Sequence, residues 1–405
     1  MSKIVRRLFA FLLTCWFVWT NIGVHTAPVG EEEESQDLLR QLQFLERRVH
    51  RGLGEDMQKI FPEGNVFTHA LYGLGWCGYA QRIGISDTLR EHALKEARWA
   101  LAQIEKKEVQ GLFPGAAELK FGVFYCGWRN YLLGSIIASG SADEDEHALF
   151  NAYSTELAKF FAASSSPFIE SYPGMAWPAD NVVAVASLAI HDRHAATRSP
   201  VIARWLEQVK LRLDQRGLVP HAWDPDRDEQ WEHGRGCSQA LINTLLPGID
   251  QEFARQQFDL FREHFFMERL GIPLVREYPK GVVGMGDVDS GPVILGAGFA
   301  ATIVGAGACR VNQDVLHAAE FDHTVEGFGL VTGTTDKRFL FGVLPIADLF
   351  IAWTRSMPTN EMAPAGLGFK RFHAWSLLAV ILLWSPTWIG LFRRRLRSQD
   401  QRTAH

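Results

Sequence analysis

The sequence lacks any concentration of positive charge. Its formal net charge is -5 at pH 7, and its Lys and Arg residues are spread along the chain. A protein that neutralises a phosphate backbone normally carries a basic stripe or patch. Nucleic acid is therefore not an expected partner.

Cysteine is also scarce, and its five copies form neither a CxxC pair nor another zinc-ligand spacing. Cys15 lies in the N-terminal leader, and the other four lie among glycine and apolar residues, which is typical of small buried side chains. The glycines of residues 281–291 lack the βαβ context of a dinucleotide site. The acidic run that starts at Asp224 lacks the turn glycine and closing Glu of a calcium loop. We therefore expect neither a metal ion nor an organic cofactor.

The N-terminus has the pattern of an export signal. Lys3, Arg6 and Arg7 precede an apolar stretch from Leu8 to Trp19, which indicates that residues 1–27 are a signal peptide or a signal anchor. Cleavage after Ala27 is one expectation, and an uncleaved anchor is the other. In both cases the body of the chain is exported.

A second apolar stretch, residues 372–392, contains no charged residue and is long enough to cross a bilayer. A core helix of this length normally shows a polar face, and this segment has none. Arginines begin directly after it, so residues 393–405 form a basic tail. The positive-inside rule places this tail in the cytoplasm and the main domain on the other side of the membrane.

Between these two stretches, residues 36–357 repeat a theme with a period of roughly 55 residues. In each unit a loop with Pro, Gly and aromatic residues leads into an apolar, glycine-rich helix, and the units are linked by charged amphipathic helices. The apolar halves begin at Phe61, Phe113, Ser171, Val219, Tyr278 and Phe339. The charged halves begin at Gln36, Ser86, Ala142, Ser199, Asp250 and Val311.

Helices that are apolar all round belong inside a protein, and amphipathic helices belong at its surface. The pattern therefore predicts an all-α protein, an (α/α)6 toroid of six helical hairpins, followed by one C-terminal transmembrane helix. A HEAT-type solenoid has a similar repeat length and is the alternative. The crowded centre of a closed ring explains better why the apolar helices are so rich in small residues. In a toroid, the loops that enter the inner helices gather at one mouth and form the rim of the cleft.

Acidic residues are placed in these rim loops. Asp180 lies at the entrance to a Val-rich helix, Glu232 lies in a loop with two tryptophans, and Asp287 and Asp289 lie in GMGDVDSGP. Glycoside hydrolysis needs one protonated and one ionised carboxyl group. We therefore predict Asp180 as a catalytic acid or base, with Asp289 or Glu232 as its partner. The alternative for Asp180 and Asp289 is that each caps its own helix.

Aromatic residues accompany these acids, as a saccharide site would require for stacking on the C–H faces of sugars. His221, His233 and Tyr125 are candidate proton carriers. Core packing is the alternative role for the tryptophans. The predicted substrate-binding residues are Tyr125, Trp128, Tyr172, Trp177, Trp223, Trp231, Arg235 and Asp287, with Arg235 holding an anionic group.

Two segments resemble the linalool dehydratase-isomerase family. Residues 124–128, Phe-Tyr-Cys-Gly-Trp, are similar to that family's Met-Tyr-Ser-Gly-His, and residues 177–181, Trp-Pro-Ala-Asp-Asn, resemble its Cys-Glu-Pro-Asp-Asn. The resemblance implies an (α/α)6 barrel that acts on a small terpene alcohol without a metal or organic cofactor, with Asp180 at the rim. The chain departs from the family at Trp128, Trp177 and Ala186, which stand where the family has a histidine and two cysteines.

The sequence thus predicts a membrane-anchored extracytoplasmic enzyme, periplasmic in a Gram-negative cell, that binds a glycan and cleaves or modifies it with paired carboxylates. One alternative is a cofactor-free dehydratase or isomerase, a carbon–oxygen lyase acting on a small apolar alcohol. It requires a closed apolar pocket with one or two acids, whereas a glycan enzyme requires an open groove. The other alternative is a non-catalytic envelope protein that binds a polysaccharide.

Overall fold

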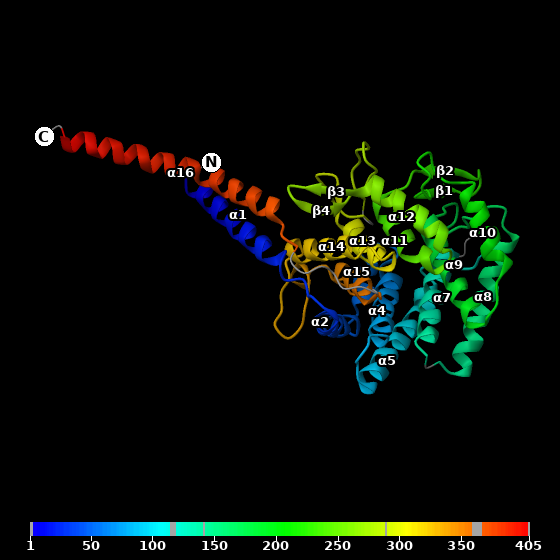
Figure 1. Cartoon of the computed structure of the whole chain (residues 1–405). Coiled ribbons are helices and arrows are strands. Elements are labelled where there is room, and N and C mark those ends of the chain that lie inside the picture. Colours follow the sequence, from blue (N-terminus) through cyan, green and yellow to red (C-terminus); the bar gives the residue numbers. More distant parts are fainter. Residues whose placement is uncertain (1–2, 114–118, 141, 288–289, 359–366, 404–405) are drawn as a thin grey trace.

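The computed structural model describes residues 3–113, 119–140, 142–287, 290–358 and 367–403. Within these ranges the protein is mostly helical, and its few strands are short. The prediction of a mainly helical chain is confirmed. Figure 1 shows a globular body of helices from which two helices project as a rod.

Six apolar helices occupy the centre of the body, one in each predicted apolar segment, and we call them the inner helices. Each contacts the next in chain order, and the last contacts the first. Most of their residues are buried, as expected of helices without a polar face. They are α4 (Gly64–Ala80), α7 (Gly122–Ala138), α9 (Pro178–His194), α11 (Gly236–Leu245), α13 (Phe299–Val311) and α15 (Pro345–Ser356).

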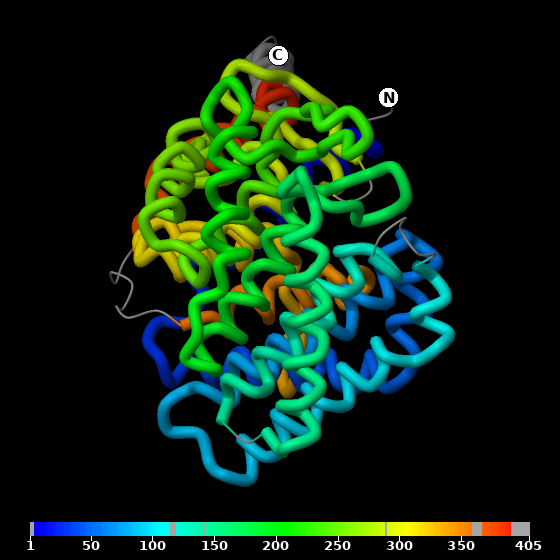
Figure 2. Tube along the Cα trace, turned by 90° about the vertical axis from the view of Figure 1, so that its right-hand side faces the viewer, coloured from blue at the N-terminus to red at the C-terminus, as the bar shows by residue number. Residues whose placement is uncertain are grey.

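Six amphipathic helices pack outside them, and we call these the outer helices. α5, α8, α10, α12 and α14 each contact the inner helix that precedes them in the chain, and α2 contacts both α4 and α15. Figure 2 views the body from the end opposite the rod. The outer helices are α2 (Glu31–Val49), α5 (Asp87–Ile104), α8 (Glu144–Ala163), α10 (Pro200–Lys210), α12 (Gln251–Phe265) and α14 (Val315–Phe328). The short helices α3 (Leu53–Gln58) and α6 (Lys107–Gln110), with 3-10 turns at Leu246–Gly248 and Leu340–Gly342, complete the body.

Inner and outer helices begin differently. Five outer helices start with a side-chain cap, as Ser86 does for α5 and Asp143 does for α8. The cap residues of the six inner helices make no such bond. For α7 and α11, a loop carbonyl takes its place, because the N–H of Val123 donates to Glu170 O at 2.9 Å and that of Gly236 donates to Glu277 O at 2.8 Å. The start of one inner helix is thus tied to the loop that enters the next.

Small residues let the inner helices approach each other closely. A Cβ atom at Gly78 on α4 would lie 2.5 Å from the hydroxyl of Ser356 on α15. A Cβ at Gly127 on α7 would lie 3.1 Å from the Cβ of Ala184 on α9. The glycine and alanine content of the inner helices is therefore a packing requirement.

The strands form antiparallel pairs in the loops before α11 and α13, a feature that the sequence did not predict. β1 (Ala222–Asp224) pairs with β2 (Glu229–Glu232), with Trp223 opposite Gln230. The other pairs are β3 (Phe266–Arg269) with β4 (Ile272–Val275), and β5 (Val293–Ile294) with β6 (Ala297–Gly298). The β1–β2 hairpin leads directly into the candidate functional site.

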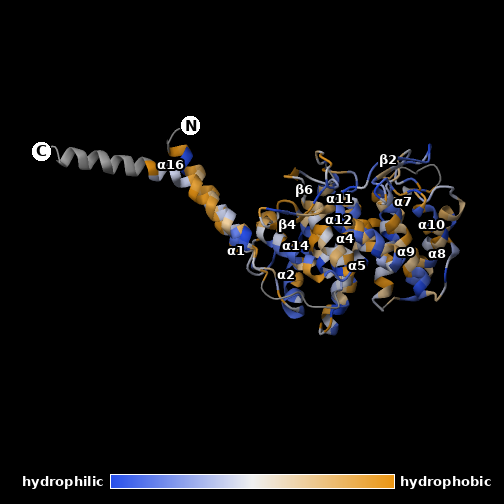
Figure 3. Cartoon of the chain, turned by 45° about the horizontal axis from the view of Figure 1, so that its top comes forward, coloured by the Kyte–Doolittle hydropathy of each residue, from blue (hydrophilic) through white to orange (hydrophobic). Residues whose placement is uncertain are grey.

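The rod consists of α1 (Lys3–Gly23) and α16 (Lys370–Thr403), which lie side by side. Among the described residues, Lys370–Ile389 is the one helical stretch with the length and apolar composition of a membrane span. The coloured part of the rod is mainly hydrophobic in Figure 3. The Nε1–H of Trp384 donates to Thr14 Oγ1 at 3.0 Å and joins the two helices.

The segment that follows α1 is built into the body. Val24 is completely buried in a small apolar cluster with residues of β4 and α16. Its carbonyl oxygen lies 2.8 Å from Nδ1 of His323 on α14. A Cβ at Gly23 would lie 2.8 Å from the Cα of Gly327. Residues of the predicted leader are therefore part of the packed structure.

Candidate functional site

A group of ionisable side chains that reaches the surface lies at the start of α11, and we call it the Arg235 site. The β1–β2 hairpin ends there, and Arg235 precedes α11 in an extended conformation. Gly236 leaves room for the neighbouring chain, because a Cβ at this position would lie 1.8 Å from the carbonyl oxygen of Arg276. This close approach brings Glu277 and Tyr278 against Arg235.

Arg235 is buried and binds several carboxylates. Its Nε donates to Glu277 Oε1 at 2.9 Å, and its Nη1 donates to Asp287 through a short hydrogen bond. The same Nη1 lies 3.7 Å from Glu232 Oε1, and the guanidinium carbon lies 5.3 Å from the centre of the Tyr278 ring. One cation thus holds carboxylates from three segments of the chain.

These carboxyl groups differ in their affinity for protons. Burial raises the pKa of Glu232, and the negative charge of Asp287 adds to this effect. Burial also acts to raise the pKa of Asp287, but hydrogen bonds from Arg235 and Ser290 outweigh it and hold that pKa well below its usual range. The two side chains remain 42% and 46% exposed, respectively. The site therefore presents solvent with one carboxyl group that retains its proton more readily and one that stays ionised.

Glu277 forms the buried floor of the site. Burial raises the pKa of Glu277, and the thiol of Cys237 donates to its Oε1 at 3.1 Å. Within the part of the chain that the structure describes, Glu277 Oε2 and Arg235 Nη2 are buried without a hydrogen-bond partner. Because burial and Glu277 raise the pKa of Cys237 well above its usual value, Cys237 is a hydrogen-bond donor here and not a thiolate nucleophile.

His221 lies at the edge of the same site. Its Nδ1 is 3.1 Å from Ser238 Oγ, and its Nε2 is 3.9 Å from Glu232 Oε2. Burial, together with the charge of Arg235, lowers the pKa of His221 to about 3. The imidazole is therefore neutral at physiological pH. To act as a proton carrier it would have to become an imidazolium ion, which its surroundings disfavour.

The structure places Asp180 on the inner helix next to α11. It is the third residue of α9 and is only 8% exposed, and α9 contacts α11. The adjacent Asn181 braces the loop, since its side chain both accepts from Ile169 N and donates to Ile169 O. Asp289, the other predicted partner of Asp180, lies outside the described residues.

The aromatic residues fall into two groups. Tyr125 and Trp128 are completely buried, with the hydroxyl of Tyr125 donating to Ile104 O and the Trp128 ring packed edge-on against Phe67 and Trp353. Trp223 is 5% exposed. In this arrangement a ligand can reach none of these three rings without displacing core side chains.

The remaining aromatic residues are at least partly accessible. Trp231 is 63% exposed on β2, next to Glu232. Tyr172 and Trp177 are half-buried and pack edge to face at 5.8 Å, and the hydroxyl of Tyr172 donates to Glu63 Oε1. Three of the six predicted aromatic contacts are thus positioned where a ligand can stack.

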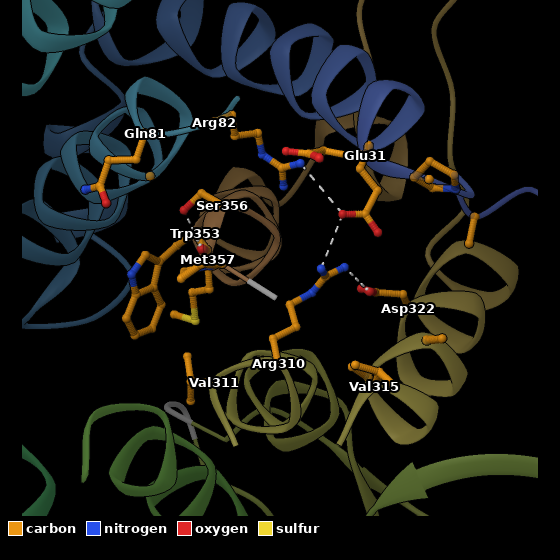
Figure 4. A pocket seen from close by; sticks show the side chains of 18 of the residues that line it. Glu31, Gln81, Arg82, Arg310, Val311, Val315, Asp322, Trp353, Ser356 and Met357 are labelled. Atoms are coloured by element: carbon orange, nitrogen blue, oxygen red, sulfur yellow. Dashed lines mark hydrogen bonds and ion pairs between the residues drawn. The ribbon is translucent and has the colours of Figure 1, made fainter. Parts of the chain in front are cut away.

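A cavity of about 650 Å³ lies at the opposite ends of the inner helices (Figure 4). Its two arginines are neutralised by neighbouring acids. Glu34 Oε2 lies 3.3 Å from Arg310 Nη1 and 3.7 Å from Arg82 Nη1, and Arg310 Nη2 donates to Asp322 at 2.5 Å. Volume favours this cavity as a binding site, but acid–base chemistry favours the Arg235 site, where carboxyl groups with different proton affinities reach solvent.

The sequence identified Glu232, Arg235 and Asp287 as rim residues, and the structure brings them together. The sequence pattern did not predict the roles of Glu277 and Cys237, which belong to different inner-helix units. The sequence signals for these two residues are local: Cys237 belongs to an Arg-Gly-Cys segment at the start of one helix, and Glu277 precedes an aromatic residue in the next unit. Neither signal indicates that the two side chains meet. No protein-family model matches the chain, and no curated protein matches it. Function is therefore inferred from these geometries.

Proposed function

We propose that this chain is a membrane-anchored (α/α)6 enzyme that binds a glycan and cleaves or modifies it at the Arg235 site. The proposal of a toroid over residues 36–357 is supported by the order of helix contacts, in which α15 returns to α4. It is also supported by α2, which contacts both of these helices and thereby serves as the sixth outer helix.

Membrane anchoring is supported by α16, whose apolar stretch Lys370–Ile389 is mostly exposed to the surroundings. Such a surface is stable when lipid covers it. Basic residues occur at the free end of each rod helix, with Arg6 and Arg7 in α1 and five arginines after residue 392. By the positive-inside rule, both chain ends lie in the cytoplasm and the main domain lies outside it.

One observation carries the catalytic proposal. Glu232 and Asp287 approach the same nitrogen of Arg235, and their pKa values are displaced in opposite directions. This is the pairing that glycoside cleavage requires, with Glu232 as the acid and Asp287 as the ionised partner. Arg235 positions the two groups. Its Nε and Nη1 are bound to carboxylates and its Nη2 is buried, so Arg235 is not itself available to a substrate anion.

The shared nitrogen also limits the separation of the pair. The oxygen atoms that approach Nη1 lie closer together than the roughly 6.5–9.5 Å of an inverting pair, so the geometry favours retention. In that scheme Glu232 protonates the departing oxygen while Asp287 attacks the anomeric carbon and forms a glycosyl–enzyme bond. Glu232 then takes a proton from water, which displaces Asp287. Trp231, Trp177 and Tyr172 supply stacking surfaces, and Asp180 and Asp289 remain proposed acids of the same rim.

Mechanism-based labelling tests this assignment. The full-length chain in detergent would be incubated with a panel of 2-deoxy-2-fluoroglycosyl fluorides, and its intact mass measured. We expect one covalent adduct, lost in Asp287→Asn and kept in Asp226→Asn, a matched exposed acid of the same region. Failure of every probe to label the folded protein, or an adduct that persists in Asp287→Asn, would contradict the assignment.

A second candidate, the dehydratase or isomerase, is favoured by Glu277. A completely buried carboxyl group with a raised pKa, a free Oε2 and a thiol beside it suits protonation of an alcohol in an apolar interior. On that proposal Glu277 protonates a hydroxyl group, water leaves, and the resulting carboxylate takes a proton from the adjacent carbon.

The two candidate functions differ in which substitution should abolish activity. Glu232→Gln should abolish glycan chemistry and spare dehydration, whereas Glu277→Gln should abolish dehydration of a small tertiary alcohol such as linalool. Products would be followed by gas chromatography and by release of reducing ends from polysaccharides. If both variants bind polysaccharide as well as the parent and the parent forms no product, the protein is a binding protein instead.

A further inference from the structure

Two histidines and two glutamates meet between the outer helices α2 and α5, far along the chain from Arg235. Glu46 and His50 are four residues apart at the end of α2, and His92 and Glu96 are four residues apart on α5. Residues spaced in this way lie on one face of a helix. Each helix therefore directs one imidazole and one carboxylate toward the other helix.

The contacts cross from helix to helix. His50 Nε2 lies 2.7 Å from Glu96 Oε2, and His92 Nε2 lies 3.1 Å from Glu46 Oε2. The ligand atoms of Glu46, His92 and Glu96 all lie within 4.8 Å of one another. Three potential metal-binding groups thus lie in one small volume, and His50 adjoins them through its contact with Glu96.

We propose that His50, His92, Glu46 and Glu96 bind a divalent transition-metal ion, with Zn²⁺ as the best match. Zinc accepts imidazole nitrogen and carboxylate oxygen in a tetrahedron at roughly 2.0–2.2 Å, which requires ligand atoms roughly 3–3.5 Å apart. One hydrogen-bonded pair, His92 with Glu46 at 3.1 Å, already has this spacing, and the other, His50 with Glu96 at 2.7 Å, is slightly shorter. The metal takes the place of the proton shared in each histidine–glutamate contact, and those protons are released to solvent.

The charges of the cluster suit a cation. Among the described residues, Glu46 and Glu96 form ion pairs with histidine and with no lysine or arginine. When both imidazoles are neutral, two carboxylate charges remain, and a divalent ion balances them. Arg47, the nearest arginine in sequence to Glu46, is paired elsewhere with Asp336.

Neighbouring side chains hold three of the ligands in place, as outer-shell groups do in metal sites. The hydroxyl of Tyr72 donates to Glu96 Oε2 at 2.7 Å. The His50 ring lies over Trp99, with ring centres 3.9 Å apart, and the His92 ring meets Trp76 edge-on at 5.3 Å. A surface pocket of about 390 Å³, lined by Glu46, His92 and Trp76, gives an ion a path to the ligands.

The position of the site indicates a structural role. α2 is the outer helix that contacts both the first and the last inner helix, so an ion between α2 and α5 would fasten the closing helix to the first helical pair. An ion that binds the folded state and not the unfolded state raises stability by RT ln(1 + [L]/Kd), so the gain grows with the ion concentration relative to its Kd. The rival explanation is that the crossed histidine–glutamate pairs join the helices without a metal.

The experiment uses the full-length chain with a tag that contains no histidine. Metal content would be measured by elemental mass spectrometry, before and after EDTA treatment and reloading with Zn²⁺, and affinity by competition with a chromogenic chelator. The test variants are His50→Ala/His92→Ala and the closely isosteric Glu46→Gln/Glu96→Gln. The matched control is His147→Ala/His194→Ala. It removes two histidines that also lie on neighbouring helices and whose rings stack on each other.

We expect about one zinc ion per chain in the wild type and in the control variant. Both test variants should bind Zn²⁺ at least roughly 100-fold more weakly than the wild type, a larger loss than removal of an outer-shell partner causes. Tyr72→Phe should weaken binding by roughly 10-fold. Zn²⁺ should raise the unfolding midpoint of the wild type and the control, and leave that of the test variants unchanged.

Cobalt substitution covers the case in which a variant does not fold. Co²⁺ bound to the wild type should give the intense visible absorption of a four-coordinate ion and quench fluorescence from Trp76 and Trp99. Three outcomes would each overturn the proposal. They are a reloaded wild type without stoichiometric Zn²⁺, a Co²⁺ spectrum typical of six-coordination, and Zn²⁺ uptake by the folded test variants equal to that of the wild type.

Discussion

Replacing Asp348 by Asn should make the protein more stable at neutral pH. Asp348 is completely buried near the start of α15. Its Oδ1 accepts from Phe339 N at 2.9 Å and from Gln41 Nε2 at 3.3 Å, and its Oδ2 has no hydrogen-bond partner among the described residues. Burial therefore raises the pKa of Asp348 to about 7, against an ordinary value of 3.8.

The sign and size of the effect follow from this difference. Because the folded state holds the proton more tightly than the unfolded state, Asp348 costs stability as the pH rises from about 4, and the loss levels off above about 7. Each tenfold change in proton affinity corresponds to about 1.4 kcal/mol, so the cost at pH 7 reaches about 4 kcal/mol. Asparagine can accept the same two hydrogen bonds and has no charge to bury.

Denaturant unfolding of Asp348→Asn and wild type in detergent, at intervals from pH 4 to pH 8, measures this effect. The variant should match the wild type near pH 4 and gain stability relative to it as the pH rises. Asp322→Asn is the control of opposite sign, because Arg310 and Arg355 outweigh burial and lower the pKa of Asp322. A stability difference for Asp348→Asn that is constant with pH, or a loss at pH 7, would refute the reasoning.

Three further predictions concern the catalytic site, the loop contacts and the leader. The rate on any glycan substrate should fall as the pH rises through the raised pKa of Glu232, which a pH–rate profile of the wild type measures, and a rate that does not fall there would contradict Glu232 as the acid. Gly122→Ala should cost about 3 kcal/mol or more in denaturant unfolding, because φ is +74° and the new Cβ would lie 2.0 Å from Ser171 O. Gly84→Ala, with a similar φ but nothing within 4 Å, should lose only about 1–2 kcal/mol. The mass of the mature protein should include residues 1–27, because Val24 is packed in the body, and a mass matching cleavage after Ala27 would contradict this.

Local patterns predicted the helices well. The charged segments predicted to begin at Ser86 and Ala142 contain the outer helices α5 and α8, and the Val-rich stretch after Asp180 forms inner helix α9. Both rod helices were recognisable as apolar. Their pairing through Thr14 and Trp384 was not, because it joins residues from opposite ends of the chain and nothing in either segment specifies the other.

The aromatic residues show why the candidate site was harder to predict. Trp223 and Trp231 belong to one hairpin and flank the same acids. Trp223 lies opposite Gln230, so the two share a face of the hairpin, and Trp231, the next residue, lies on the other face. Composition alone could not separate the buried ring from the exposed one, because the distinction depends on the strand register.

The four proposed zinc ligands could have been found from the sequence separation at which adjacent outer helices meet. His50 contacts Glu96 and His92 contacts Glu46, both at a separation of 46 residues. Two more contacts, Arg98 with Glu146 and Tyr153 with Glu105, join α5 to α8 at a separation of 48. Adjacent outer helices therefore meet at nearly matching positions. A search for metal ligands 46 residues apart, less than the roughly 55-residue repeat period, would have paired His50 with Glu96 and His92 with Glu46. Linear zinc motifs examine only ligands close together in sequence.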